Sequence, residues 1–304
     1  MIAKLMSAGA RCATLALLAI LLAGRDAFAW GPDGHRIVCE IAYQQLDARL
    51  RNEIGRLSRA YRTPDGRTLR FFTDGCVFPD EARTKARDNM FGWDHFDPFD
   101  RWHFLNVPRT ARHVRASDCQ NDCALTGIDR HATALATARS DQDRAEALFF
   151  LGHWVADVHQ PLHVSYSDDH GGNDVAPIRG GFYTSQDLHG VWDSGIVATP
   201  ESRDGGWRSY AGHLAARITA ADRTAWISTP PLSWADESYA LTTLAPLEYC
   251  EWKNAGGGEV CAPIPRVRTL GPQYQRDFQS RVETRLQQAG VRLADLIRQR
   301  LTVR

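Results

Sequence analysis

Four side chains able to bind metal or move protons lie close together in an otherwise apolar segment. They are His153, Asp157, His159 and His163, in LGHWVADVHQPLH at 151–163. The apolar neighbours indicate that the segment packs into a core, where ionisable groups are costly unless paired, hydrogen-bonded or bound to metal. His153 and Asp157 are four positions apart. A helix would therefore project both from one face, as two ligands of one metal ion require.

The second half of this segment has a different role. Pro161 lacks a backbone N–H and disturbs the helix, so we expect His163 to lie past a kink, where it can reach a second ion. His159 lies off the face shared by His153 and Asp157. We therefore expect it to support the structure or a neighbouring ligand.

The same four-residue spacing recurs in LHGVWD, residues 188–193, which carries His189 and Asp193. Neutral imidazole and carboxylate are good zinc ligands, and the order of the two residue types excludes the H-E-x-x-H pattern of zinc proteases. Two more ligand candidates lie beside aromatic residues, His103 in RWHFLN and Asp80 in CVFPDEAR.

The N-terminal stretch is predicted to be a signal peptide. A basic start is followed by the apolar run ATLALLAILLAG, residues 13–24, and by AFA before Trp30. This is the pattern of a secretory leader with an A-x-A cleavage site. The run is too short for a comfortable transmembrane helix, and no later apolar stretch is long enough. We expect removal of 1–29 by cleavage after Ala29, leaving 30–304 as one domain of a periplasmic or secreted protein.

Cleavage at that point would create a metal ligand. It leaves a free α-amino group on Trp30, and the pKa of such a group, about 7.7–8.0, is low enough for a metal ion to displace its proton. His35 follows five residues later in WGPDGH. The position of both residues at the mature terminus indicates a shared metal site.

The cysteines agree with export. Seven become six once Cys12 leaves with the signal peptide, and an even number in an exported chain is typical of disulfides. Of the fifteen possible pairings, proximity in the chain favours Cys119–Cys123 and Cys250–Cys261, which leaves Cys39 with Cys76. Zinc binding by cysteine is the competing interpretation, but the chain has no C-x-x-C pair.

Helical patterns dominate the chain, and no convincing set of alternating strands appears. Apolar residues recur at helical spacing in 34–46, 126–138, 143–160, 206–223 and 272–302. Loops rich in turn formers occupy 63–66, 170–174 and 254–259. The fold class is therefore predicted to be all-α, a multi-helix bundle with long functional loops. The charged final helix is expected to be solvated and amphipathic, closing the bundle.

Composition also bears on partners and source. The formal net charge is zero, so no global basic field attracts polyanions, and a nucleic-acid substrate would need local cations or metal. The chain has no N-x-[ST] glycosylation site, and its basic residues are mostly arginine. Together with the signal peptide, these features favour a bacterial source.

Taken together, the motifs resemble those of a known family. The mature start W-G-x-x-G-H, the segment H-x-x-x-D-x-H-Q-P-L-H, the G-G-N loop and the pair H-x-x-x-D occur in that order from Trp30 to Asp193. They resemble the zinc-dependent type I nucleases, the single-strand-preferring nucleases and 3′-nucleotidases of fungi, plants and some bacteria. The resemblance implies the all-α bundle that this family shares with the zinc phospholipases C.

The resemblance implies three zinc ions per chain. The first would be held by Asp80, His103, His153 and Asp157. The second would be held by His163, His189 and Asp193. The third would be held by the amine and carbonyl of Trp30, His35 and a bridging oxygen of Asp157. The resemblance to plant members also favours the Cys39–Cys76 disulfide.

The implied reaction is hydrolysis of a phosphodiester. Two zinc ions sharing a water would lower its pKa and supply hydroxide for in-line attack on phosphorus, and the third would stabilise the departing 3′ oxygen. Arg83 would contact the phosphoryl oxygens, Asp80 would orient the attacking water, and Asp157 would bridge two ions. The implied products are 5′-phosphorylated nucleotides and free 3′ hydroxyls.

The implied substrates are single-stranded DNA, single-stranded RNA and 3′-nucleotides, bound by a monomer away from any membrane. Phe104 matches the family's base-stacking position, and unpaired bases are free to stack. Asn106 departs from fungal members, which tend to have aspartate there, and its amide both donates and accepts. Asn173 matches the G-G-N loop as a phosphate contact or a hydrogen-bond partner behind the ligands.

Two other functions compete with the nuclease. A zinc phospholipase C is similar in its mature tryptophan and ligand spacing, but its last ligand is typically glutamate where this chain has Asp193. The G-G-N loop also favours the nuclease. The second alternative is a secreted zinc-binding protein without catalysis, although structural zinc sites are normally closed and four-coordinate.

Overall fold

The computed structural model describes residues 30–120, 122–175, 178–179, 182–185, 187–264 and 268–301. The predicted signal peptide, 1–29, lies outside the described residues. Helices make up most of the described chain, and the strands form small two-stranded sheets. The prediction of an all-α fold is confirmed.

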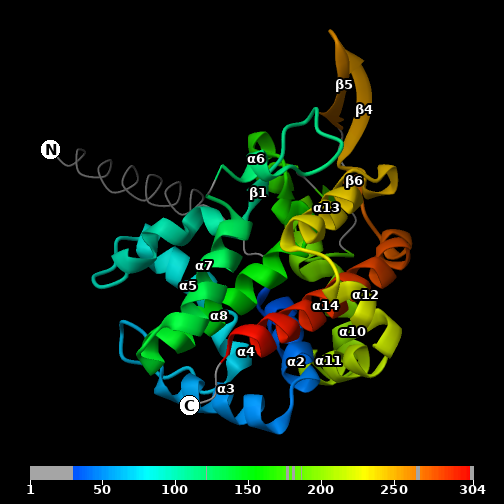
Figure 1. The fold of residues 1–304 in the computed structure, drawn as a ribbon. Helices are drawn as coiled ribbons and strands as arrows, with labels where there is room; N and C mark the ends of the chain where they lie inside the picture. Colours follow the sequence, from blue (N-terminus) through cyan, green and yellow to red (C-terminus); the bar gives the residue numbers. More distant parts are fainter. Residues whose placement is uncertain are drawn as a thin grey trace, which may run out of the picture.

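Helix α8, Asp141–Val158, lies in the middle of the bundle (Figure 1). It begins after Ser140, whose hydroxyl accepts a hydrogen bond from the Asp143 N–H and caps the helix. Almost every side chain beyond the first turn is buried, as expected of a helix that is apolar on all sides. The helices packed around it are α2, Pro32–Gln45; α3, Ala48–Ala60; α7, Ala124–Thr137; and α14, Pro272–Arg300.

Helix α14 is not the solvated helix that its charged sequence predicts. It crosses the bundle against α2 and α8 (Figure 1), and Arg285 and Arg292 are only 3% and 1% exposed. Both arginines pair with Glu237, and Arg292 also contacts His159 Nε2 at 2.8 Å. Through this contact His159 faces α14. In the sequence, a buried arginine whose donors are satisfied by a carboxylate looks the same as a surface arginine, which explains the wrong expectation.

The helix predicted over 206–223 is two helices, α11 at Trp207–Ala216 and α12 at Ala220–Ile227. A capping box separates them. The Thr219 hydroxyl accepts from the Asp222 N–H, and the Asp222 carboxylate accepts from the Thr219 N–H. These two bonds satisfy donors at a new N-terminus, where α12 begins.

The remaining helices are short, and several carry site residues. The α-helices are α4, Phe72–Gly75; α5, Phe78–Arg87; α6, Ala116–Cys119; α9, Leu188–Gly190; α10, Ile196–Arg203; and α13, Pro231–Thr242. The 3-10 helices are η2, Asp94–His103; η3, Pro161–His163; η4, Ser167–Gly172; and η6, Ala245–Leu247. A π-helical turn, η5, spans Val191–Gly195.

Three two-stranded sheets occur in the described chain. Strand β1, Leu105–Asn106, pairs in parallel with β2, Val164–Ser165; β3, Ile178–Arg179, pairs in parallel with β6, Arg268–Thr269. The largest is an antiparallel hairpin of β4, Cys250–Ala255, and β5, Gly258–Pro263, which projects from the bundle (Figure 1). The turn of this hairpin, residues 256–257, lies inside the predicted loop at 254–259, and the two strands extend into both ends of that loop. The sequence showed no convincing set of alternating strands, so this hairpin was not expected. Its glycine-rich turn hid the short strands on either side.

The disulfides pair as proximity and resemblance suggest: Cys39–Cys76, Cys119–Cys123 and Cys250–Cys261. The first joins α2 to the segment before α5, and the third closes the base of the hairpin. Within the described part of the chain, no helix has the length and apolar character needed to cross a bilayer.

The crossing of α14 over α2 depends on a glycine. A Cβ at Gly290 would lie 2.4 Å from Ile41 Cγ2 and 3.2 Å from the Val38 carbonyl oxygen. We expect Gly290→Ala to lower the free energy of unfolding by about 1–3 kcal/mol, because α2 or α14 must shift.

Urea unfolding in EDTA measures this loss. The matched control is Gly212→Ala, in the interior of α11, where a Cβ would meet nothing within 4 Å among the described residues. That variant should be more stable by about 0.5–1 kcal/mol. Equal stability of Gly290→Ala and the parent protein would contradict the close crossing.

Candidate metal centre

Five predicted ligands converge from four helices. His153 and Asp157 project from one face of α8, Asp80 lies in the first turn of α5, His103 ends η2, and His35 lies in α2. Each is 2% exposed or less. Ionisable side chains gathered at this depth need a charged partner or a metal ion to offset the loss of water.

The first group of donors gathers around one oxygen of Asp157. Its Oδ2 lies 3.3 Å from both His153 Nε2 and His103 Nδ1, and these two nitrogens are 3.0 Å apart. Asp80 Oδ1 lies 3.6 Å from each nitrogen. Two imidazoles and two carboxylates that converge in this way form the donor set of a zinc site.

The other oxygen of Asp157 faces a second group. Its Oδ1 lies 3.4 Å from His35 Nε2, which is also 3.9 Å from Asp80 Oδ2. The His35 ring stacks on the His153 ring at 3.9 Å between centroids. Trp30 is fully buried, and the Gly31 N–H donates to the Asp193 carbonyl at 2.8 Å, so this segment is held at the site.

A separate group is formed by His163, His189 and Asp193. The two Nε2 atoms are 3.1 Å apart, and His189 Nε2 lies 3.2 Å from Asp193 Oδ2. His163 follows Pro161 in η3, past the end of α8, as the proline predicts. The π-helical turn after α9 carries Asp193. These three residues form one of the described clusters that could hold a metal ion.

Backbone carbonyls set the tautomers of three predicted ligands. His153 Nδ1 donates to the Cys76 carbonyl at 2.8 Å, His163 Nδ1 to the His103 carbonyl at 2.6 Å, and His189 Nδ1 to the Gly171 carbonyl at 2.7 Å. A carbonyl can only accept, so each Nδ1 carries the proton. Each Nε2 lone pair is therefore directed into the centre.

The roles of two supporting residues were not predicted from the sequence. Gln160 Nε2 donates to Asp193 Oδ1 at 2.5 Å, while Gln160 Oε1 accepts from the Leu162 N–H. The signal was a polar residue inside the apolar ligand segment. Gly171 has φ +64°, and a Cβ there would lie 2.7 Å from the Leu162 carbonyl oxygen. Glycine allows the loop to approach and orient His189.

Burial controls the charges of the centre. It raises the pKa of Asp80 to about 7 and that of Asp157 well above its ordinary range. It lowers the pKa of His35, His103 and His163 well below 6.5. Neutral imidazoles are ready to bind metal, and a dication would return both carboxylates to the ionised form.

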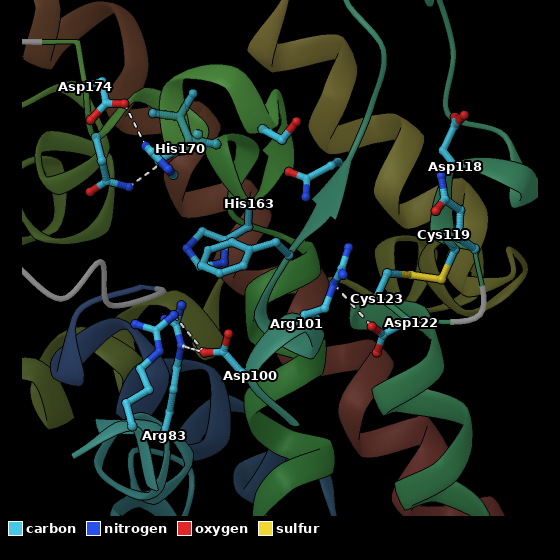
Figure 2. Close-up of a pocket in the computed structure, with 18 residues that line it drawn as sticks. Arg83, Asp100, Arg101, Asp118, Cys119, Asp122, Cys123, His163, His170 and Asp174 are labelled. Atoms are coloured by element: carbon cyan, nitrogen blue, oxygen red, sulfur yellow. Dashed lines mark hydrogen bonds and ion pairs between the residues drawn. A yellow bond between two sulfur atoms is a disulfide. The ribbon is translucent and has the colours of Figure 1, made fainter. Parts of the chain in front are cut away.

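A cavity of about 710 Å³ opens beside the centre, and His163 lies in its wall (Figure 2). Arg83 and the three predicted substrate-binding residues, Phe104, Asn106 and Asn173, also line it. The Phe104 ring lies 4.9 Å from both the Arg83 guanidinium carbon and the His163 ring centroid. Asn173 Nδ2 donates to the His170 carbonyl and so braces the G-G-N loop.

Comparison with known proteins agrees with this geometry. The sequence profile described as S1/P1 Nuclease matches residues 30–302. Endonuclease 2 of Arabidopsis thaliana is 30% identical over 90% of this chain and 91% of its own length. Nuclease P1 of Penicillium citrinum is 28% identical over 64% of this chain and 74% of its own length. Nuclease S1 of Aspergillus oryzae is 29% identical over 44% of this chain and 47% of its own length. These matches do not favour a phospholipase or a non-catalytic zinc protein.

Removing metal should make stability depend on pH. We expect the unfolding free energy of metal-free parent protein minus that of metal-free Asp80→Asn to fall as the pH rises from about 4 to about 8. With its pKa raised to about 7, folded Asp80 keeps a proton that the unfolded residue, with a pKa of 3.8, has lost. That stability is complete below the unfolded pKa and is lost as the pH rises through 7. The lowered histidine pKa values act in the opposite sense up to about one pH unit above 6.5, and the comparison with Asp80→Asn cancels their contribution.

Urea unfolding in EDTA at a series of pH values tests this expectation. The control is the same series with saturating zinc, in which the cation keeps the carboxylates ionised and the fall should disappear. The same pH dependence in metal-free parent protein and in Asp80→Asn would show that Asp80 is not protonated in the fold.

Proposed function

The chain belongs to the S1/P1 nuclease family, and we propose that it is a zinc-dependent endonuclease and 3′-nucleotidase acting on single-stranded DNA and RNA. It would release 5′-phosphorylated products. The proposal that the protein binds zinc rests on buried polar atoms without hydrogen-bond partners. Both ring nitrogens of His35 and all four carboxylate oxygens of Asp80 and Asp157 have no hydrogen-bond partner among the described residues. Buried polar atoms without partners are rare in native proteins.

Three zinc ions fit these donors. The residues that would hold them are Asp80, His103, His153 and Asp157 for the first; His163, His189 and Asp193 for the second; and the Trp30 amine and carbonyl, His35 and Asp157 for the third. Histidine nitrogen and carboxylate oxygen are the donors zinc prefers in catalytic sites. The two oxygens of Asp157 face different groups, which supports its role as a bridge.

Zinc, when bound, would act as a Lewis acid at the phosphate and would lower the pKa of a coordinated water towards neutrality. The protein's own groups orient the reactants. Arg83 is 8% exposed and held by Asp100, so its guanidinium offers fixed donors to the phosphoryl oxygens. An ionised Asp80 carboxylate accepts a hydrogen bond from the attacking water and fixes its direction.

The nucleobase would bind at Phe104. Its ring contacts Arg83 and His163, so a base stacked there brings its phosphate towards a cation and a metal ligand. Stacking on an aromatic ring contributes about 1–3 kcal/mol per base and suits every base. Paired bases are already stacked, which accounts for the preference for single strands. The Asn106 amide, in the same cavity, would hydrogen-bond the base edge.

We also propose that the active protein is an exported monomer beginning at Trp30. Three disulfides support an oxidising compartment. Burial of Trp30 and the bond from the Gly31 N–H to Asp193 support a chain start built into the centre. A free amine there would complete the third zinc site.

Elemental analysis of the processed protein should find close to three zinc ions per chain. Zinc-loaded protein should cleave single-stranded DNA and RNA to 5′-phosphate ends, and EDTA should abolish the cleavage. His189→Asn should lose one ion and most activity, whereas the control His213→Asn, an exposed residue paired with Asp204, should keep both. Three ions with release of phosphocholine from lipid instead would indicate the phospholipase, and one ion or none would overturn the three-zinc centre.

The terminal amine can be tested by adding one residue before Trp30. The extension converts the amine into an amide that cannot bind metal, so we expect loss of the third zinc and at least a tenfold loss of activity. Circular dichroism should show that the fold survives. The matched control carries the same extension with a protease site that restores Trp30 as the first residue, and full activity should return. An extended protein with three ions and normal activity would rule out the amine ligand.

A further inference from the structure

A second arginine lies beside Arg83 in the cavity wall. Arg83 and Arg87 are one helical turn apart on α5, so both side chains project from one face. Asp100 Oδ1 accepts from Arg83 Nε at 2.7 Å and from Arg87 at 2.8 Å. Because they share one carboxylate oxygen, the two guanidinium groups lie side by side.

The two arginines differ in exposure. Arg83 is 8% exposed and lies against Phe104, whereas Arg87 is 45% exposed and lies nearer the solvent. This part of the wall holds two guanidinium groups beside the carboxylate of Asp100. The reaction at a single phosphate uses Arg83 and leaves Arg87 without a role. A guanidinium group has five donors in a fork that matches the oxygens of a phosphate.

The opposite wall has the opposite charge. Asp118 and Asp122 line the cavity there, on and beside α6, and Asp122 pairs with Arg101 at 3.2 Å. Figure 2 shows Arg83 and Asp100 on one side of His163 and these two aspartates on the other. A polyanion is repelled by carboxylates and attracted by the α5 side. The phosphates of a bound strand should therefore follow α5.

We propose that Arg87 binds the phosphate next to the scissile one and so forms a subsite that a polynucleotide fills and a 3′-mononucleotide leaves empty. The proposal rests on the proposed nuclease function and adds a residue that distinguishes polymer from mononucleotide. In the resting protein Asp100 holds Arg87 at the cavity wall. A neighbouring phosphate accepts hydrogen bonds from the Arg87 guanidinium group.

The test compares substrates with one and two phosphates. For Arg87→Gln we expect kcat/KM for the trinucleotide TpTpT to fall about five- to tenfold relative to kcat/KM for the dinucleotide TpT. The slope of log kcat/KM against log salt for TpTpT should become shallower by about 0.7, the value for one phosphate contact on a single strand. Arg87→Lys keeps the charge and should keep the slope.

A neutral linkage provides the sharper measurement. A methylphosphonate can replace the phosphate on either side of the cleaved one. On the side where Arg87 binds, Arg87→Gln should cause no further loss of kcat/KM. Two changes that remove one contact are not additive. The matched control is Arg217→Gln, which removes an exposed, ion-paired arginine that does not line the cavity. It should leave all these ratios unchanged.

Each outcome decides a separate question. Equal losses for TpT and TpTpT, or an additive effect of the methylphosphonate on both sides, would overturn the subsite while leaving the nuclease intact. Cleavage of neither substrate by the zinc-loaded parent protein would instead overturn the proposed function. An unchanged salt slope in Arg87→Gln would show that Arg87 contacts no phosphate.

Discussion

The burial of Asp157 is the constraint on which the rest of the centre depends. Its carboxylate is fully buried, both oxygens lack a hydrogen-bond partner among the described residues, and burial raises its pKa well above the ordinary range. An uncompensated charge at that depth would cost several kcal/mol. A dication on each side would offset the cost. Because Asp157 lies in an almost fully buried helix, metal binding and folding are thermodynamically coupled.

The surrounding fold directs the remaining donors towards that carboxylate. Three of the candidate histidine ligands donate Nδ1–H to carbonyls from three separate segments, those of Cys76, His103 and Gly171. The Cys39–Cys76 disulfide joins the first of these segments to α2. The β1–β2 pairing links the segments that follow His103 and His163. Small irregular elements thus define the geometry of the centre, while the long helices provide a rigid frame for it.

Sequence spacing predicts what lies on one element and misses what depends on the fold. The pair His153 and Asp157 follows from helical periodicity, and the kink before His163 follows from Pro161. Convergence of residues from different helices came from the family resemblance, because spacing carries no information on distances between elements. Gln160 escaped prediction because its bond to Asp193 joins residues far apart in the chain. The buried arginines of α14 were misread as solvated, since a paired interior charge and a surface charge have the same sequence signature.

The distribution of charge explains how a chain with zero formal net charge can bind a polyanion. Attraction cannot come from a global field, so it must be local. In the proposed centre three dications face the carboxylates of Asp80, Asp157 and Asp193, which leaves a buried positive excess. Exclusion of water strengthens the electric field of this positive charge at short range, and the neighbouring carboxylates weaken it at longer range. A nucleic-acid strand is then attracted where the centre and the α5 arginines lie together and is repelled at the opposite wall. The same charge asymmetry therefore favours binding and sets the path of the strand through the cavity.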